Sequence, residues 1–162
     1  MKEILLVEDL DSDAELIQTA LKVAGAANPV RRLINGEQAI AYLIQAEEAA
    51  AIGPPVPSIL LLDLKLPGIS GFEILERLKD RQAFAKMLRI VFSQFGDSNS
   101  IRRAYSLGAH SFLSKPVQSA DLRGLFEMFP GYWTFDVSLK NIPTVPSDRP
   151  GDSAADDGRL TP

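Results

Sequence analysis

The chain has 162 residues, of which 46% are hydrophobic and 23% are charged, values that are ordinary for one soluble globular domain. The net charge of -4 argues against a DNA-binding surface, and the lack of cysteine excludes disulfides, thiolate metal sites and a cysteine nucleophile. The amino-terminal segment is unlike a signal peptide, and no apolar run approaches the ~20 residues that span a membrane, so we expect a cytoplasmic protein.

The first predicted strand is Ile4–Val7, a continuous apolar run that ends in the acid pair Glu8-Asp9. Ser12 and Glu15 form a capping-box pattern, which predicts that the next helix starts there. Gly25 follows the last apolar residue at helical spacing, so we expect the helix to end at this glycine.

The next two elements are a weak strand and a helix. Val30–Leu33 contains two arginines, as an edge strand can, and the Asn35-Gly36 turn follows it. Apolar residues at helical spacing over 39–44 predict a helix with one apolar face. Gln45–Pro57 is then read as the end of that helix followed by an extended loop.

The central strand is predicted at Ile59–Leu62, an unbroken apolar run that Pro57 and Pro67-Gly68 keep short. Such a run is typical of a parallel strand covered by helices on both faces. Asp63 stands at its carboxyl end, where open α/β sheets bind their ligands. Taken alone, Asp63 is either a site residue or a loop aspartate that caps the next turn.

The second half of the chain continues the alternation of helices and strands. Its segments are a helix from about Ser70, a strand over 88–92 that ends in Ser93, a helix closed by Gly108, a strand over 110–114 followed by Lys115-Pro116, and a helix over 122–129. Five strands alternating with five helices predict an α/β fold, a doubly wound five-stranded parallel sheet. Residues 141–162 are rich in Pro, Asp, Ser and Gly, so disorder is expected there.

Charged and polar residues follow four of these strands: Glu8-Asp9, Asp63, Ser93 and Lys115. The carboxyl ends of parallel strands share one edge of the sheet, so these side chains should meet there. Clustered acids raise each other's pKa, and a hard cation such as Mg²⁺ would relieve that repulsion. Metal, hydroxyl and lysine would neutralise phosphoryl oxygens, and a carboxylate can accept a phosphoryl group.

Three motifs together resemble the receiver domain of two-component response regulators: LLVEDLDSD, ILLLDLKLPGISG and GAHSFLSKP. The resemblance covers roughly residues 2–129 and implies a flavodoxin-like sheet of order 2-1-3-4-5. We therefore divide the chain into a receiver domain, residues 1–134, and a C-terminal extension, residues 135–162, disordered from about 141.

The resemblance implies a role for each residue of the acidic edge. Asp63 matches the phosphoacceptor, which is also a metal ligand. Asp9 matches the acid that binds Mg²⁺ directly, and Glu8 the acid that usually reaches it through water. The backbone carbonyl of Lys65 matches the third protein ligand of the metal.

The resemblance also implies the residues that contact phosphate and transmit the switch. Ser93 matches the switch hydroxyl and Lys115 the lysine that pairs with the phosphoryl group. The family implies a cis peptide bond at Lys115-Pro116, which proline makes possible. Phe112 matches the aromatic residue that turns inward when the hydroxyl moves toward phosphate.

Some positions depart from the family or have simpler interpretations. Gln94 stands where a small residue is usual, and Phe95 follows it; both could alter access to the site and the rate of dephosphorylation. His110 is interpreted as a half-exposed strand residue rather than a metal ligand. The aromatic residues from Phe126 to Trp133 are interpreted as packing residues, part of which could serve a dimer.

The predicted function is a stand-alone response regulator, not an enzyme beyond Mg²⁺-dependent self-phosphorylation and self-dephosphorylation. Its partners are a sensor histidine kinase or phosphotransfer protein, an unidentified downstream protein and, as one route to output, a second copy of the chain. The 45–57 loop and the PGYWTFDVSL stretch resemble regulators that partner phytochrome-type kinases. Two alternatives are a phosphate-independent interaction module and a flavin- or nucleotide-binding flavodoxin-like protein. Against the latter, EDLDSD follows the first strand in place of a Gly-rich phosphate loop.

Overall fold

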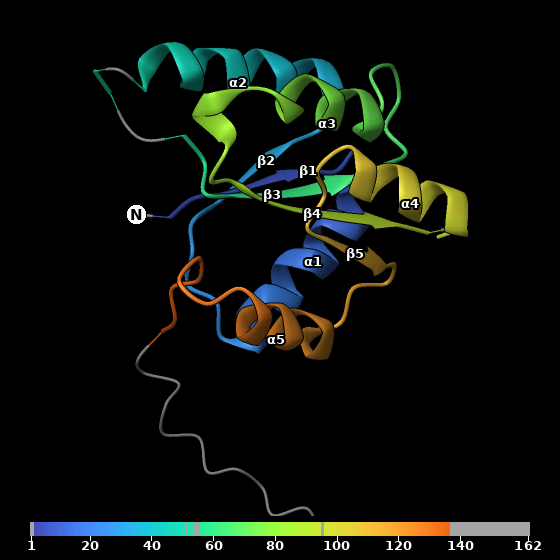
Figure 1. The fold of residues 1–162 in the computed structure, drawn as a ribbon. Helices are drawn as coiled ribbons and strands as arrows, with labels where there is room; N and C mark the ends of the chain where they lie inside the picture. The colour runs from blue at the N-terminus through green and yellow to red at the C-terminus, as the bar shows by residue number, and fades with distance from the viewer. Residues whose placement is uncertain (1, 51, 54–55, 95, 137–162) are drawn as a thin grey trace, which may run out of the picture.

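Strands and helices alternate along the computed structural model, which describes residues 2–50, 52–53, 56–94 and 96–136 (Figure 1). The strands are β1 (Ile4–Val7), β2 (Val30–Leu33), β3 (Ile59–Asp63), β4 (Leu88–Ser93) and β5 (Ser111–Ser114). The helices are α1 (Asp11–Ala24), α2 (Gly36–Ala49), α3 (Gly71–Lys79), α4 (Ser98–Ser106) and α5 (Ser119–Met128), with a 3₁₀ turn at Gln82–Phe84. The predicted alternation is confirmed, whereas the 3₁₀ turn was not predicted.

The five strands form one parallel sheet in the order β2-β1-β3-β4-β5, which confirms the predicted fold class. β2 pairs with β1 alone, so the arginine-bearing segment 30–33 is an edge strand as predicted. Because all pairs are parallel, the carboxyl ends of the strands lie along one edge of the sheet, and the amino ends along the opposite edge.

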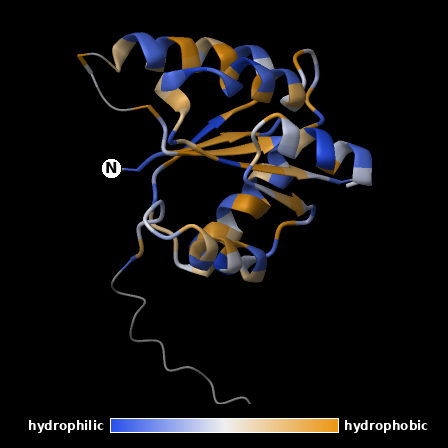
Figure 2. Ribbon diagram, in the orientation of Figure 1, coloured by the Kyte–Doolittle hydropathy of each residue, from blue (hydrophilic) through white to orange (hydrophobic). Residues whose placement is uncertain are grey.

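Helices cover both faces of the sheet, with α1 and α5 on one side and α2 and α3 on the other (Figure 1). Alternate residues of β1 enter different clusters: Ile4 and Leu6 pack toward α1 and α5, and Leu5 and Val7 pack toward α2 and α3. Most residues of the central strands are therefore hydrophobic (Figure 2). Burial of each large aliphatic side chain in these strands stabilises the folded state by about 1.5–3 kcal/mol relative to its exposure to water. Among the described residues, no helix is both long and apolar enough to cross a membrane.

The ends of α1 test two predictions about capping. Gly25 ends the helix as predicted, in a left-handed conformation (φ 99°) that glycine adopts without strain. The capping box predicted for Ser12 and Glu15 is wrong, because the helix begins earlier, at Asp11, with Leu10 as the N-cap. The Leu10 N–H instead donates to the carboxylate of Glu8, so the preceding acid ties down this turn.

The segment after α5 returns to the amino-terminal edge of the sheet. The buried side-chain amide of Asn28 donates to the carbonyls of Lys2 (2.8 Å) and Tyr132 (3.1 Å). Its oxygen accepts from the Thr134 N–H at 2.8 Å. One side chain therefore joins the start of the chain to the segment that follows the last helix.

Aromatic packing reinforces this connection. Trp133 is buried with its ring 4.5 Å from that of Phe126, so the packing role predicted for these aromatic residues is confirmed. Phe135 forms an isolated antiparallel bridge with Ala26, so the ordered contacts continue past residue 134. The disorder predicted from about residue 141 lies outside the described residues.

A buried arginine also lies near the amino-terminal edge, in β4. The Arg89 guanidinium donates to the carbonyls of Leu78 (3.3 Å) and Phe84 (3.0 Å), near the ends of α3 and the 3₁₀ turn. The Arg89 N–H donates to Nδ1 of His110 at 3.0 Å. His110 is exposed and immediately precedes β5, one residue outside the predicted strand.

Candidate functional site

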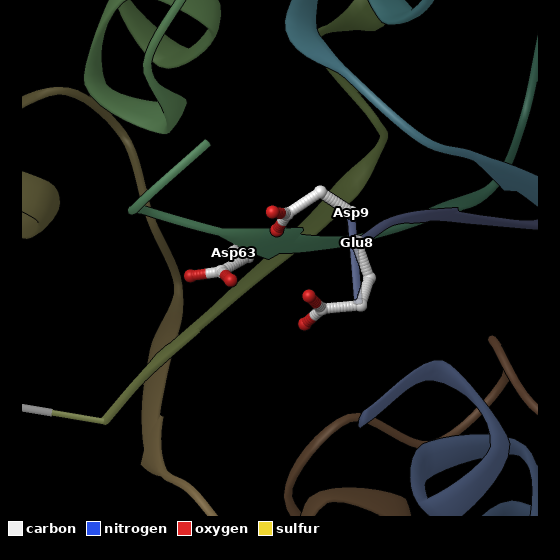
Figure 3. Close-up of side chains that lie close together, drawn as sticks. All are labelled: Glu8, Asp9 and Asp63. Atoms are coloured by element: carbon white, nitrogen blue, oxygen red, sulfur yellow. The ribbon is translucent and has the colours of Figure 1, made fainter. Parts of the chain in front are cut away.

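Three acidic residues converge at the carboxyl-terminal edge of the sheet: Glu8, Asp9 and Asp63 (Figure 3). One carboxylate oxygen from each lies within 4.8 Å of the others. Glu8 is fully buried and Asp63 is 3% exposed. Two acids are therefore held out of water beside a third, an arrangement that is costly unless positive charge compensates it.

The register of the sheet explains why these acids meet. Val7 of β1 pairs with Leu62 of β3, so Glu8 and Asp63 leave adjacent strands at the same level. The loop after β3 then packs closely against the strand end, since a Cβ on Gly71 would lie 2.4 Å from the Asp63 carbonyl oxygen. Glycine is thus required at position 71 for the chain to turn back so close to Asp63.

Each buried acid also accepts a backbone hydrogen bond from the loop that follows it. Glu8 Oε1 accepts from the Leu10 N–H at 3.0 Å, and Asp63 Oδ1 accepts from the Lys65 N–H at 3.0 Å. These bonds fix the carboxylates in orientation and leave their second oxygens for other partners.

The second oxygens face the ammonium group of Lys115, which follows β5. Lys115 Nζ donates to Asp63 Oδ2 and to Asp13 Oδ2, both at 2.8 Å, and lies 2.7 Å from Glu8 Oε2. The peptide bond between Lys115 and Pro116 is cis. The Lys115 ammonium group therefore contacts three carboxylates, which come from the turn after β1, from α1 and from β3.

Burial and charge act in opposite directions on this cluster. Burial raises the pKa of Glu8 to about 7, even though Lys115 and a backbone hydrogen bond both oppose the shift. Burial alone would lower the pKa of Lys115, but its contacts with Asp13, Asp63 and Glu8 raise it well above the usual value. One ammonium group thus stays charged but does not fully compensate the acids.

The donor set fits a hard divalent cation. Glu8 Oε2 is buried and, among the described residues, has no partner with hydrogen-bond geometry, despite its ion-pair contact with Lys115. Such an orphaned oxygen beside two further carboxylates suits a cation that prefers oxygen ligands, as Mg²⁺ and Mn²⁺ do. The cluster of Glu8, Asp9 and Asp63 is therefore a candidate divalent-cation site.

The predicted switch residues lie beside this cluster. Ser93 is buried at the end of β4, where it pairs with Ser114 of β5, and its carbonyl accepts from the Lys115 N–H at 3.0 Å. Phe112 is half-buried, and a Cβ on Gly96 would lie 2.9 Å from its ring. The aromatic ring therefore packs directly against the loop that follows Ser93.

Comparison with known protein families gives a match over most of the chain. The response regulator receiver domain matches residues 4–127. This chain belongs to that family. The match confirms the family that the three sequence motifs predicted.

Relatives of this receiver domain align over most of their length. It is 34% identical over 130 residues to the probable methanogenesis regulatory protein FilR2 of Methanothrix harundinacea, covering 80% of this chain and 82% of FilR2. It is 31% identical over 144 residues to the response regulator Rcp1 of Synechocystis, covering 89% of this chain and 95% of Rcp1. The similarity is thus not confined to a short motif.

Two solved structures similar to this receiver domain carry groups relevant to the acidic edge. The Mn²⁺-bound form of Rcp1 superposes with a TM-score of 0.67 at 28% identity, covering 84% of this chain and 99% of that one. The phosphorylated cyanobacterial phytochrome response regulator RcpA superposes with a TM-score of 0.65 at 31% identity, covering 83% and 97%. One neighbour therefore holds a divalent cation and the other is phosphorylated.

Two of the three remaining predicted positions, Lys65 and Gln94, have exposed side chains. The Lys65 side chain is exposed, as expected for a residue whose proposed contribution is its carbonyl. Gln94 is also exposed, next to the buried Ser93. Phe95 lies outside the described residues.

Sequence reasoning missed two residues at this site. Asp13, one turn into α1, contacts Lys115, and its place within the LLVEDLDSD motif was the available signal. Arg32 of β2 donates to the carbonyls of Glu8 (3.1 Å) and Asp9 (3.2 Å) and forms an ion pair with Asp11 at 2.6 Å. Arg32 thus braces the turn that carries the acid pair, a role that the prediction of an arginine-bearing edge strand did not include.

Proposed function

We propose that this receiver domain accepts a phosphoryl group on Asp63 from a sensor histidine kinase or a phosphotransfer protein. The observation that carries the proposal is the position of Asp63 at the sheet edge. Its carboxylate lies 2.8 Å from the Lys115 ammonium and adjoins the acids Glu8 and Asp9. A carboxylate in such a site is oriented, screened from water and next to a cation that can contact a second anion.

The chemistry of the transfer follows from these residues. An oxygen of the Asp63 carboxylate forms a bond to phosphorus while the phosphorus–nitrogen bond of the donor phosphohistidine breaks, and the electron pair leaves on the histidine nitrogen. Glu8, Asp9, Asp63 and the Lys65 carbonyl would hold Mg²⁺, which would supply positive charge to neutralise the acids and the phosphoryl oxygens. Lys115 contacts the phosphoryl oxygens of the product and stabilises their charge.

The signal then passes to the neighbouring strand ends. In this proposal the Ser93 hydroxyl moves toward the new phosphoryl group and Phe112 turns inward behind it. The close packing of Phe112 against Gly96 supports the link, because a shift of that loop opens space for the ring. The altered surface at α4 and β5 would bind a downstream protein or a second copy of the chain.

The proposal also covers the division of the chain, its reactions and the kind of kinase that it meets. We retain the division into a receiver domain (1–134) and an extension (135–162), with self-phosphorylation and self-dephosphorylation as its only reactions. Coverage of 95% of Rcp1 supports a single-domain regulator, and the likeness to RcpA supports a phytochrome-type kinase as its partner. The cytoplasm as the place of this exchange is part of the proposal.

Intact-mass spectrometry after incubation with acetyl phosphate and Mg²⁺ tests the function. The wild-type chain should gain one phosphate, whereas Asp63→Asn should gain none because the amide oxygen is a poor nucleophile. Chelation of the cation should also prevent the gain. A gain of the same size in Asp63→Asn would place the phosphate elsewhere and contradict the proposal.

A further inference from the structure

Lys115 is held by one acid that lies outside the candidate metal site. Asp13 Oδ2 accepts a hydrogen bond from Lys115 Nζ at 2.8 Å, and Asp13 does not belong to the three-acid cluster. The side chain of Lys115 is 10% exposed and that of Asp13 is 26% exposed. The contact therefore forms at the rim of the site, between the first turn of α1 and the end of β5.

The geometry separates the partners of Lys115 into two groups. Its contacts with Glu8 and Asp63 use oxygens of residues that also form the metal cluster. A cation bound there draws on the same carboxylates, and a phosphoryl group on Asp63 uses one of its oxygens covalently. Asp13 is the carboxylate partner of Lys115 whose oxygens are needed neither for cation binding nor for phosphorylation of Asp63.

We propose that Asp13 is a positioning residue that anchors the Lys115 ammonium beside Asp63 during phosphoryl transfer. This inference rests on the proposed function. A lysine side chain has four flexible bonds and loses orientation when it has no fixed partner. With Asp13 in place, one donor stays on α1 while the other donors are available to the phosphoryl oxygens.

Loss of the anchor should slow the transfer without weakening cation binding. In Asp13→Asn the shape is kept but the charge-assisted hydrogen bond is weakened. We expect the rate at saturating acetyl phosphate to fall about tenfold, which corresponds to about 1.4 kcal/mol in the barrier. The half-saturating concentration of acetyl phosphate and the affinity for Mg²⁺ should each change less than about twofold.

The experiment measures phosphate gain over time by intact mass, at several acetyl phosphate concentrations, and Mg²⁺ affinity by calorimetry. Glu15→Gln is the matched control, since it removes one charge from an exposed position of the same helix and should keep the wild-type rate. Asp13→Glu, which keeps the carboxylate, should recover at least part of the lost rate.

A double-mutant cycle shows whether Asp13 acts through Lys115. Asp13→Asn should add no further loss to Lys115→Gln, because the group that it positions is already absent. A wild-type rate in Asp13→Asn, or an undiminished tenfold loss in the Lys115→Gln background, would overturn the positioning role. Absence of phosphate gain in the wild-type chain is a different result, which would overturn the proposed function and this role with it.

Discussion

Two buried polar side chains at opposite edges of the sheet, Asn28 and Glu8, differ in how their atoms are paired. At the amino-terminal edge, Asn28 uses both its amide nitrogen and its oxygen in hydrogen bonds, whereas Arg89 donates to two carbonyls and keeps a buried Nε without a partner among the described residues. At the carboxyl-terminal edge, a buried oxygen of Glu8 has no partner with hydrogen-bond geometry in the described part of the chain, and its ion-pair partner Lys115 is shared among three acids.

The difference separates groups that complete the fold from groups that prepare a site. A satisfied buried amide stabilises the native state, because its loss leaves its backbone partners unpaired. A buried acid with incomplete compensation destabilises the native state until a cation arrives. Asn28 therefore adds to the stability of the fold, whereas Glu8 gives up part of it.

The largest effect should come from breaking the amino-terminal edge. Asn28→Ala removes three hydrogen bonds to backbone groups, so we expect the free energy of unfolding to fall by about 3–4 kcal/mol. Urea denaturation followed by the fluorescence of Trp133, the single tryptophan, measures this loss. Asn99→Ala, at an exposed position of α4, is the control and should stay close to wild type. A similar loss in both variants would remove the distinction drawn for Asn28.

The next effect should have the opposite sign and arise at the carboxyl-terminal edge. The folded-state pKa of Glu8 is about 7, above its ordinary value of 4.5. Its contribution to stability is therefore complete below pH 4.5 and is lost as the pH rises toward 7. In metal-free buffer at pH 8, Glu8→Gln should raise the free energy of unfolding, on the order of 2–3 kcal/mol.

The same variant should bind Mg²⁺ more weakly, because it loses a ligand charge. Urea denaturation at pH 4 and pH 8 checks the stability, and calorimetry checks the affinity. Equal stabilisation at both pH values would show that ionisation of Glu8 is not its cause.

The smallest effect concerns pH at the amino-terminal edge. Although His110 is exposed at the surface, partial desolvation of its imidazole and the nearby Arg89 guanidinium lower its pKa below the ordinary 6.5. The stability that it contributes is therefore present above pH 6.5 and is lost as the pH falls through the folded-state value. His110→Gln should reduce the fall in the free energy of unfolding between pH 7.5 and 5.5, measured by urea denaturation, by less than about 0.5 kcal/mol. A steeper fall of the free energy of unfolding with falling pH in this variant would contradict a lowered pKa of His110.

The sequence predicted the strands, their order and the residues at their carboxyl ends. It did not predict contacts that a side chain makes with a distant segment. The unbroken apolar runs indicated central strands, because only such strands are buried on both faces, and parallel pairing then placed Glu8 near Asp63. The contact of Arg32 with the acid turn depends on a long side chain that crosses from a neighbouring strand. Asn28 likewise gains its role from a segment 104 residues away, which no local pattern records.

The Asn28 connection also determines where the two ends of the folded chain emerge. The carbonyls of Lys2 and Tyr132 lie 2.8 Å and 3.1 Å from one amide nitrogen, on the side of the sheet away from the strand tips that carry Asp63 (Figure 1). Ends this close can be joined by a short linker, so the domain suits circular permutation. A permuted chain whose linker joins Lys2 to the segment after Tyr132 would keep every strand of the sheet.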